Sequence, residues 1–234
     1  GDNALFGNGG NDLLRASTGA NTLNGGAGDD TFFSGDGADM IDGEDDFDIV
    51  SYADSTAGVT VDASSSAAQS GGFAEGDVLM NIEQITGSDF DDVLTTITQT
   101  LRDPDFTGKL FVLDGGAGDD HLTTNSDFSL LRGGDGDDTL SVGGGTTFGE
   151  LFSGAGEDRF EIGPGITDAT IRDFEAGIDM VFLDVADDAT RADLENDSSD
   201  IASGVLINVG EESGGTLFIE GYTLAQVIDD IALI

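Results

Sequence analysis

Apolar side chains recur at every ninth position over the first fifty residues, each between small or polar neighbours. Residues 25–33, 34–42 and 43–51 read GGAGDDTFF, SGDGADMID and GEDDFDIVS, so that glycine, acid and apolar residue recur in phase. The last three residues of each unit alternate outward, inward and outward, which predicts a three-residue strand with one buried side chain. The predicted inward residues are Leu14, Phe32, Ile41, Val50, Leu122, Leu140 and Phe160.

The first six positions of each unit predict a tight turn before the strand. Glycines at positions one, two and four permit backbone conformations that are closed to other residues, and they let carbonyl groups approach a ligand closely. Position six presents an acid. Two units make one coil of about 18 residues, so every second unit stacks on the same side at the strand spacing of roughly 4.8 Å. Like charges therefore stack on like charges.

A stack of carboxylates requires a compensating cation. Two carboxylates about 5 Å apart repel by roughly 3 kcal/mol at an effective dielectric constant near 20, and each added coil repeats this penalty. Carboxylate and carbonyl oxygens, in a chain without Cys, favour a hard cation. Flexible turns suit calcium better than magnesium, which requires a tight octahedral geometry. The sequence thus predicts several Ca²⁺ ions between the turns.

In the first block, residues 1–51, position six is occupied by Asn3, Asp12, Asn21, Asp30, Asp39 and Asp48. Asp12, Asp30 and Asp48 fall on one side of the predicted coil. The other three fall on the opposite side, where the loss of charge and the poor unit at 16–24 predict weaker or missing calcium.

In the second block the position-six acids are Asp92, Asp120, Asp138 and Asp158. Their separations predict 18-residue coils with insertions of ten, none and two residues, the largest within 96–113. The turn at 125–128 lacks the glycines, so it is expected to keep the coil and to lose the metal.

This repeat resembles the G-G-x-G-x-D-x-U-x pattern, with U apolar, of RTX proteins, also called haemolysin-type calcium-binding repeats. The resemblance implies an all-β fold, a right-handed parallel β-roll. It also implies that each Ca²⁺ lies between two stacked turns. The ligands are then the carbonyls of positions two and four and the position-six Asp of one unit, with the carbonyls of positions one and three and the Asp of the next.

Transferred to this chain, the resemblance implies four full ligand sets and one weaker set. In the first block they are Asn8, Gly10, Asp12, Gly25, Ala27 and Asp30, then Gly26, Gly28, Asp30, Gly43, Asp45 and Asp48. In the second block they are Gly116, Gly118, Asp120, Gly133, Asp135 and Asp138, then Gly134, Gly136, Asp138, Ser153, Ala155 and Asp158. The weaker set is Ser88, Phe90, Asp92, Gly115, Ala117 and Asp120, because Phe90 replaces a glycine and ten residues intervene. Asp39 is a further candidate ligand, on the side where calcium is expected to be weaker.

Charge links the metal to folding and location. The chain has 48 Asp and Glu against 7 Lys and Arg, a formal net charge of −41, so self-repulsion should keep the metal-free chain expanded. Metal binding and folding then become one event. The expected affinity for extracellular calcium modules, roughly 10⁻⁴ to 10⁻³ M, favours a secreted or cell-surface location. The RTX resemblance implies a type I secretion substrate, with the secretion apparatus as a partner during export.

The sequence shows no apolar run of about 20 residues and no N-terminal signal peptide, so neither a membrane span nor the general secretory route is predicted. Residues 1–6 fit positions four to nine of a unit whose first half is missing. We therefore expect the sequence to be a fragment of a longer protein.

Two regions depart from the repeat. Residues 52–86 contain alternating segments at 58–62 and 77–85, expected to be spacer strands that continue the roll; the alternative is a separate calcium site that uses Asp77 and Glu83. The second block is expected over 87–161. Residues 162–234 are expected to form a β-rich C-terminal cap, with a hairpin of 204–209 and 216–220 and a short helix after the capping box of Thr223 and Gln226. Its segments 173–179 and 221–224 resemble the C-terminal cap of RTX proteins, which implies that this region carries the secretion signal.

Catalysis and nucleic-acid binding are not predicted. His121, the single histidine, stands at an outward position beside Asp120 and is expected to be a solvated surface residue. The net charge opposes nucleic acid. The expected function is a non-catalytic folding and export module of a larger secreted bacterial protein. Two alternatives remain: a segment of a calcium-dependent adhesin or surface layer, with self-assembly or cell-surface contact, and an accessory module of an extracellular hydrolase whose active site lies upstream.

Overall fold

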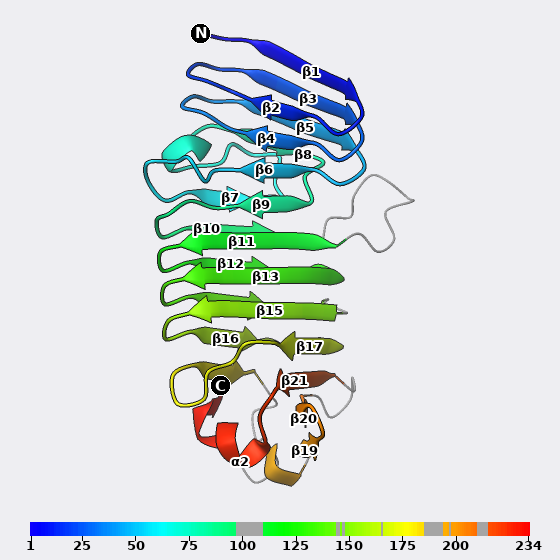
Figure 1. Ribbon diagram of the computed structural model, residues 1–234, viewed down its shortest axis with the longest axis vertical. Coiled ribbons are helices and arrows are strands. Elements are labelled where there is room, and N and C mark those ends of the chain that lie inside the picture. Colours follow the sequence, from blue (N-terminus) through cyan, green and yellow to red (C-terminus); the bar gives the residue numbers. More distant parts are fainter. Residues whose placement is uncertain are drawn as a thin grey trace.

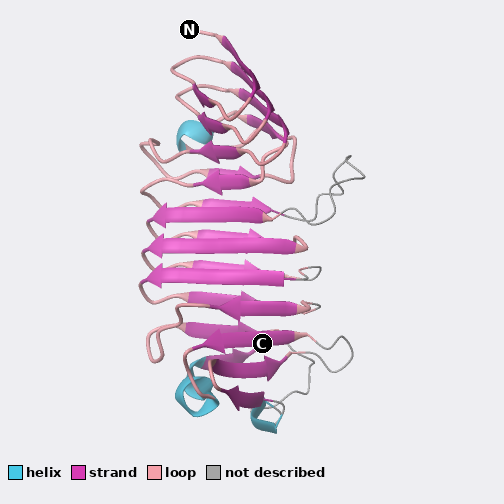
Figure 2. Cartoon of the chain, turned by 45° about the vertical axis from the view of Figure 1, so that its right-hand side comes forward, coloured by secondary structure: helices cyan, strands magenta, loops and turns pink. Residues whose placement is uncertain are grey.

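Short, mostly parallel strands stacked in two layers form the body of the roll (Figures 1 and 2). The computed structural model describes residues 1–96, 110–143, 146, 148–164, 166–184, 194–196, 198–209 and 215–234. Within these residues the strands form three sheets, one making up the first layer and two making up the second. This arrangement confirms the predicted all-β parallel roll.

The first layer is an eleven-stranded sheet that runs from the N-terminal coils into the C-terminal cap. In spatial order it contains β2 (Leu13–Arg15), β4 (Thr31–Phe33), β6 (Ile49–Ser51), β9 (Gln84–Thr86), β11 (Phe111–Ala117), β13 (Phe128–Asp135), β15 (Phe148–Ala155), β17 (Asp168–Ile171), β21 (Thr216–Glu220), β20 (Gly204–Asn208) and β19 (Ser198–Ile201).

The second layer consists of two sheets that meet at the spacer. The four-stranded sheet contains β1 (Ala4–Gly9), β3 (Thr22–Ala27), β5 (Met40–Asp45) and β8 (Val78–Met80). The seven-stranded sheet contains β7 (Thr60–Asp62), β10 (Val93–Thr96), β12 (His121–Thr124), β14 (Thr139–Val142), β16 (Arg159–Ile162), β18 (Met180–Leu183) and β22 (Ile231–Leu233).

The strand registers of the first block confirm the predicted coil length. Ala4 of β1 pairs with Thr22 of β3, and Thr22 pairs in turn with Met40 of β5. Each step along this sheet is therefore one coil of two nonapeptide units, without an insertion.

The registers of the second block confirm the predicted insertions. Val93 of β10 pairs with His121 of β12, so this step contains one coil and the ten-residue insertion. His121 pairs with Thr139 of β14, which is one coil without an insertion. Thr139 pairs with Arg159 of β16, which is one coil with the two-residue insertion. Residues 97–109 of the first insertion lie outside the described residues.

The core is a column of inward side chains contributed by the stacked strands. All seven predicted inward residues are buried, and most of them are fully enclosed. Because each coil adds one apolar layer on the last, the core continues along the whole stack rather than forming a centre.

The spacer is built into the roll. Strand β9 pairs with β6 on one side and with β11 on the other, so the eleven-stranded sheet is continuous through it. In the opposite layer β8 pairs with β5 and ends one sheet, while β7 pairs with β10 and begins the next. A short 3-10 helix, η1 (Gly72–Ala74), lies between β7 and β8. The strands expected in this region are therefore present.

The cap closes the last coil. Strands β20 and β21 pair antiparallel, which confirms the predicted hairpin, and β21 pairs with β17 of the roll. The predicted terminal helix is α2 (Leu224–Val227), with the Gln226 side chain accepting a hydrogen bond from the Thr223 N–H at 2.9 Å. It continues into η2 (Ile228–Asp230). The described residues contain no candidate membrane-spanning helix.

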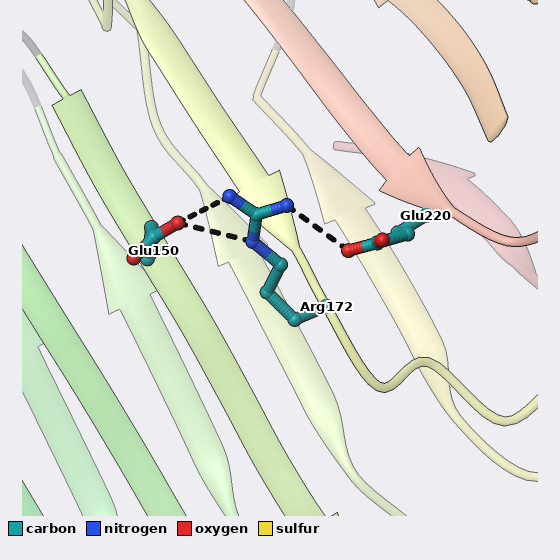
Figure 3. A network of polar contacts seen from close by, with 3 residues as sticks. All are labelled: Glu150, Arg172 and Glu220. Atoms are coloured by element: carbon teal, nitrogen blue, oxygen red, sulfur yellow. Dashed lines mark hydrogen bonds and ion pairs between the residues drawn. The ribbon is translucent and has the colours of Figure 1, made fainter. Parts of the chain in front are cut away.

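A cation on the outer face ties the cap to the roll. Arg172, just after β17, forms an ion pair with Glu150 of β15 and a second ion pair of 3.0 Å with Glu220 of β21 (Figure 3). The neighbouring carboxylates raise the pKa of the Arg172 guanidinium. In a chain with few cations, this side chain neutralises repulsion at the junction of two segments.

Candidate calcium sites

The position-six acids form two ladders of hydrogen bonds along the roll. In each rung the backbone N–H of one position-six residue donates to the Oδ1 atom of the acid in the next coil. The Asp12 N–H donates to Asp30 at 2.8 Å, and the Asp30 N–H donates to Asp48 at 2.9 Å. The same bond joins Asp92 to Asp120, Asp120 to Asp138 and Asp138 to Asp158, at 2.8, 2.8 and 2.9 Å. Each rung fixes the carboxylate and occupies one oxygen.

The second carboxylate oxygen of each aspartate shows which of these side chains lack a hydrogen-bond donor for that atom. Within the described residues, six position-six aspartates have an Oδ2 atom that is buried and accepts no hydrogen bond: Asp12, Asp30, Asp48, Asp120, Asp138 and Asp158. A buried polar atom without a partner costs about 1–3 kcal/mol, and more when it is charged, so native structures rarely keep one. All six belong to the ligand sets implied by the RTX resemblance.

The first glycine of each unit marks a space on which these oxygens converge. A Cβ atom at Gly25 would lie 2.1 Å from Asp30 Oδ2 and 2.9 Å from the Gly43 carbonyl oxygen. At Gly133 the corresponding distances are 2.1 Å to Asp138 Oδ2 and 2.5 Å to the Ser153 oxygen. In both cases a carboxylate of one coil and a carbonyl of the next face a space that only glycine leaves open.

The backbone of the turns is the same in every full ligand set. Positions two and four have positive φ throughout, for example 107° at Gly26 and 114° at Gly28, and 112° at Gly116 and 111° at Gly118. Glycine adopts this conformation without a steric penalty. The recurring turn explains why the glycines return at these positions of the unit.

Burial disfavours the charged form of Asp120, Asp138 and Asp158 when no cation is bound. Desolvation raises the pKa of Asp120 to about 8 and that of Asp138 to about 7, with the neighbouring aspartates as a further cause. Burial also raises the pKa of Asp158. A divalent ion between the turns would reverse this, because its charge favours the carboxylate form.

The donor set fits calcium. Each implied ligand set combines two carboxylates with main-chain carbonyls, all of them hard oxygen ligands. Accordingly, no group of three or more His, Cys, Asp or Glu side chains surrounds a single metal position in the described part of the chain.

The two ladders of acids lie on opposite edges of the roll. We call the edge at the C-terminal ends of β1, β3 and β5 the first edge; it carries Asp12, Asp30 and Asp48. The second edge is at the C-terminal ends of β4, β6, β9, β11, β13 and β15, which all pair in parallel. It carries Asp120, Asp138 and Asp158. In Figure 1 the arrowheads of β3 and β5 accordingly point right, and those of β11, β13 and β15 point left.

On the second edge of the first block, neutral groups donate hydrogen bonds to the carboxylates. Asp39 Oδ1 accepts from the Asn21 N–H at 2.7 Å and from its Nδ2 at 2.8 Å. The Ser34 hydroxyl lies 3.1 Å from Asp39 Oδ2 and 2.7 Å from Asp77 Oδ2, so the two carboxylates share its one proton. The next rung is Asp77, which accepts from the Asp39 N–H and from the Tyr52 hydroxyl. Burial raises the pKa of Asp77 to about 6 and raises that of Tyr52. Both oxygens of Asp39 are thus engaged, in agreement with the unequal sides of the sequence pattern.

The weaker ligand set differs from the full sets because protein groups donate hydrogen bonds to both oxygens of its first carboxylate. Asp92 Oδ1 accepts from the Val59 N–H at 2.6 Å, and Asp92 Oδ2 accepts from the Ser88 N–H at 2.5 Å. Both oxygens of this carboxylate therefore have donors from the protein. Even so, a Cβ at Gly87 would lie 2.2 Å from Asp92 Oδ2 and 2.4 Å from the Gly115 oxygen, so the two predicted ligands converge.

The alternative of a common site for Asp77 and Glu83 is wrong. Asp77 is the rung after Asp39 on the second edge and accepts a hydrogen bond from the Asp39 N–H. Glu83 is the rung after Asp48 on the first edge and accepts a hydrogen bond from the Asp48 N–H at 2.9 Å. His121 is exposed and interacts with the Thr123 hydroxyl at 3.3 Å, as expected for a surface residue.

Comparisons with known proteins agree with the repeats. The family model of the RTX calcium-binding nonapeptide repeat (4 copies) matches residues 1–23, 15–50 and 114–148. No curated protein sequence matches the chain. Among solved structures, the chain is similar to the extracellular lipase LipA from Serratia marcescens, with 18% sequence identity and a TM-score of 0.34. That match covers 96% of this chain and 38% of the lipase, so the chain spans well under half of the lipase's length. The chain thus carries RTX calcium-binding nonapeptide repeats at residues 1–50 and 114–148, within a parallel β-roll.

Proposed function

We propose that this β-roll folds when calcium binds outside the cell, and that it serves as the folding and export module of a larger secreted bacterial protein. The observation that carries the proposal is the set of six buried Oδ2 atoms without hydrogen-bond donors. Five of them face the space beside the first glycine of a turn: those of Asp12, Asp30, Asp48, Asp120 and Asp138. A folded chain that left these carboxylates uncompensated would repel itself at every coil.

The size of the calcium effect supports coupled folding. With a dissociation constant of about 10⁻⁴ M, one ion at 1 mM free calcium stabilises the fold by about 1.4 kcal/mol. Four such ions contribute about 6 kcal/mol, which is comparable to the whole stability of a typical domain. At submicromolar calcium they contribute almost nothing. Folding is then confined to calcium-rich surroundings.

Export follows from the same switch. A chain with a formal charge of −41 that stays expanded at low calcium is suited to pass a secretion channel unfolded and to fold on arrival. RTX repeats are typical of secreted proteins, which supports a type I secretion apparatus as the partner. The cap at 162–234 is the proposed location of the secretion signal.

Circular dichroism during a titration with EDTA tests the folding proposal. We expect most of the strand signal to disappear on chelation and to return on addition of calcium, with a midpoint of about 0.1–1 mM. Magnesium at the same concentrations is the control and should not restore the signal. A spectrum unchanged by EDTA would show that the acids are only a solvated surface.

Coexpression with a type I secretion apparatus tests the export proposal separately. The full chain should accumulate in the medium, whereas a variant truncated after residue 161 should stay in the cells. Equal secretion of both would remove the cap from the export role and leave the calcium-dependent folding intact.

A further inference from the structure

The first ladder, formed by the acids Asp12, Asp30 and Asp48 on the first edge, continues beyond the last nonapeptide unit of the first block. Asp42 of β5 pairs with Met80 of β8, and Ile49 of β6 pairs with Gln84 of β9. The turn 43–48 is therefore stacked on the short segment 81–83 of the spacer, which has three residues where the repeat has six. No glycine-rich motif is present in this segment.

Glu83 takes the place of the position-six aspartate. It is 4% exposed, and its Oε2 atom accepts the hydrogen bond from the Asp48 N–H at 2.9 Å, as Asp48 does from Asp30. Glutamate has one methylene group more than aspartate. The longer side chain compensates for the shorter turn, so a carboxylate still occupies the next rung.

The same convergence of oxygens is present here as at the repeat sites. A Cβ atom at Gly43 would lie 2.3 Å from the Asn81 carbonyl oxygen and 2.3 Å from Asp48 Oδ2. Asp48 is fully buried, and its Oδ2 atom accepts no hydrogen bond. A carboxylate oxygen of one coil and a carbonyl oxygen of the next thus face one small space, as they do beside Gly25 and Gly133.

The turn keeps the conformation of the other sites although its residues disfavour it. Positions two and four are Glu44 and Asp46, with φ of 71° and 78°, where the other full sets have mostly glycine. A left-handed conformation costs about 1–2 kcal/mol for a residue with a side chain. The conformation is retained where the sequence no longer favours it, which is the pattern of a turn shaped for a ligand.

We propose that turn 43–48 and segment 81–83 form a further Ca²⁺ site. Its ligands are the carboxylates of Asp48 and Glu83 and the carbonyl of Asn81, with the carbonyls of Glu44 and Asp46 contributing by their position in the turn. This inference rests on the proposed calcium binding of the repeats. It extends the first ladder by one ion into the spacer, and it joins the repeat block to β8 and β9 through a metal rather than through packing alone.

Native mass spectrometry at saturating calcium tests the site through the variant Glu83→Gln. Glutamine has nearly the same shape and keeps an oxygen to accept the Asp48 N–H, so only the charge is removed. We expect the variant to bind one Ca²⁺ fewer than the unmodified chain. The matched control is Asp77→Asn, a buried rung of the same spacer on the opposite edge, which should leave the ion count unchanged.

An unchanged ion count in Glu83→Gln would overturn this site while leaving the repeat sites standing. An unmodified chain that binds no calcium would instead overturn the proposed function. If Glu83→Gln does not fold in calcium, Gly43→Ala provides a second test, because the added methyl group fills the space between Asn81 and Asp48. It should also remove one ion, and a full count in Gly43→Ala would equally refute the site.

Discussion

Neutralising Asp30 should affect the protein in opposite directions with and without calcium. Asp30→Asn and Asp39→Asn form a matched pair, because both residues occupy position six and are 0% and 2% exposed. Both use Oδ1 to accept an N–H from the preceding coil, at 2.8 and 2.7 Å. They differ in Oδ2: that of Asp39 shares the Ser34 hydroxyl proton with Asp77, whereas that of Asp30 accepts no hydrogen bond.

The structure sets the expected magnitude. Asp30 belongs to two ligand sets, and with a dissociation constant near 10⁻⁴ M each ion contributes about 2.7 kcal/mol at 10 mM calcium. Asp30→Asn should therefore lower the free energy of unfolding by up to about 5 kcal/mol in calcium. Asp39→Asn changes only hydrogen bonds among neutral donors and should cost about 1 kcal/mol.

Without calcium the order reverses. Asp30 lies between Asp12 and Asp48, and each pair repels by about 3 kcal/mol at the strand spacing and an effective dielectric constant near 20. Removing the charge relieves both repulsions, so in EDTA the Asp30→Asn chain should retain more strand signal than the unmodified chain. Asp39→Asn should show little difference in EDTA.

Urea denaturation followed by circular dichroism, at 10 mM calcium and in EDTA, measures both effects. Equal destabilisation by the two variants in calcium would refute the assignment of ions to the first edge. A loss of strand signal by Asp30→Asn in EDTA would refute the electrostatic argument, because it would mean that the carboxylate stabilises the fold without a metal.

Three further outcomes are expected. In a calorimetric titration, calcium should bind more weakly at pH 6 than at pH 8 and should release protons, because burial raises the pKa of Asp120 to about 8 and that of Asp138 to about 7. The calcium-free fold holds more protons than the unfolded chain, so its stability should fall as the pH rises from about 4 to 8. A calcium affinity that does not depend on pH would contradict this reasoning. Gly133→Ala should bind one Ca²⁺ fewer in native mass spectrometry, because its methyl group would lie 2.1 Å from Asp138 Oδ2. In the control Gly149→Ala the nearest atom is 3.5 Å from the added methyl group, so the number of bound ions should not change. Equal numbers of bound ions in the two variants would refute a metal position beside Gly133. Arg172→Gln should lower the melting temperature by a few degrees at a constant ion count, since partly exposed ion pairs contribute up to about 1 kcal/mol each, and an unchanged melting temperature would show that Arg172 does not hold the cap.

The sequence predicts the parts of this fold that depend on neighbouring residues. The coil lengths follow from the spacing of the acids, because each acid precedes a three-residue strand with one inward apolar residue. The hairpin and the short helix of the cap follow from alternation and from the capping residues Thr223 and Gln226.

The shift of the candidate calcium ligands from the first edge to the second edge could not be predicted from neighbouring residues. It depends on how 52–86 returns, with β8 completing one sheet and β7 starting the next, and this pairing is between residues far apart in the chain. The pairing of β22 with β18 is unpredictable for the same reason.

A local signal for the extra rungs was nevertheless present. Asp77 precedes Val78–Met80, and Glu83 precedes Gln84–Thr86. Each is an acid followed by a strand with one inward residue, which is the second half of the nonapeptide unit without its glycines. A search for that half-unit alone would have placed both residues in the ladders, one on each edge.

A crystal structure determined in 10 mM calcium, with an anomalous difference map, tests the central claim most directly. We predict peaks between the turns of Asp12, Asp30 and Asp48 on the first edge and between those of Asp120, Asp138 and Asp158 on the second edge, each peak bounded by an Oδ2 atom and a carbonyl of the next coil. Ordered turns with no peak between them would contradict the account.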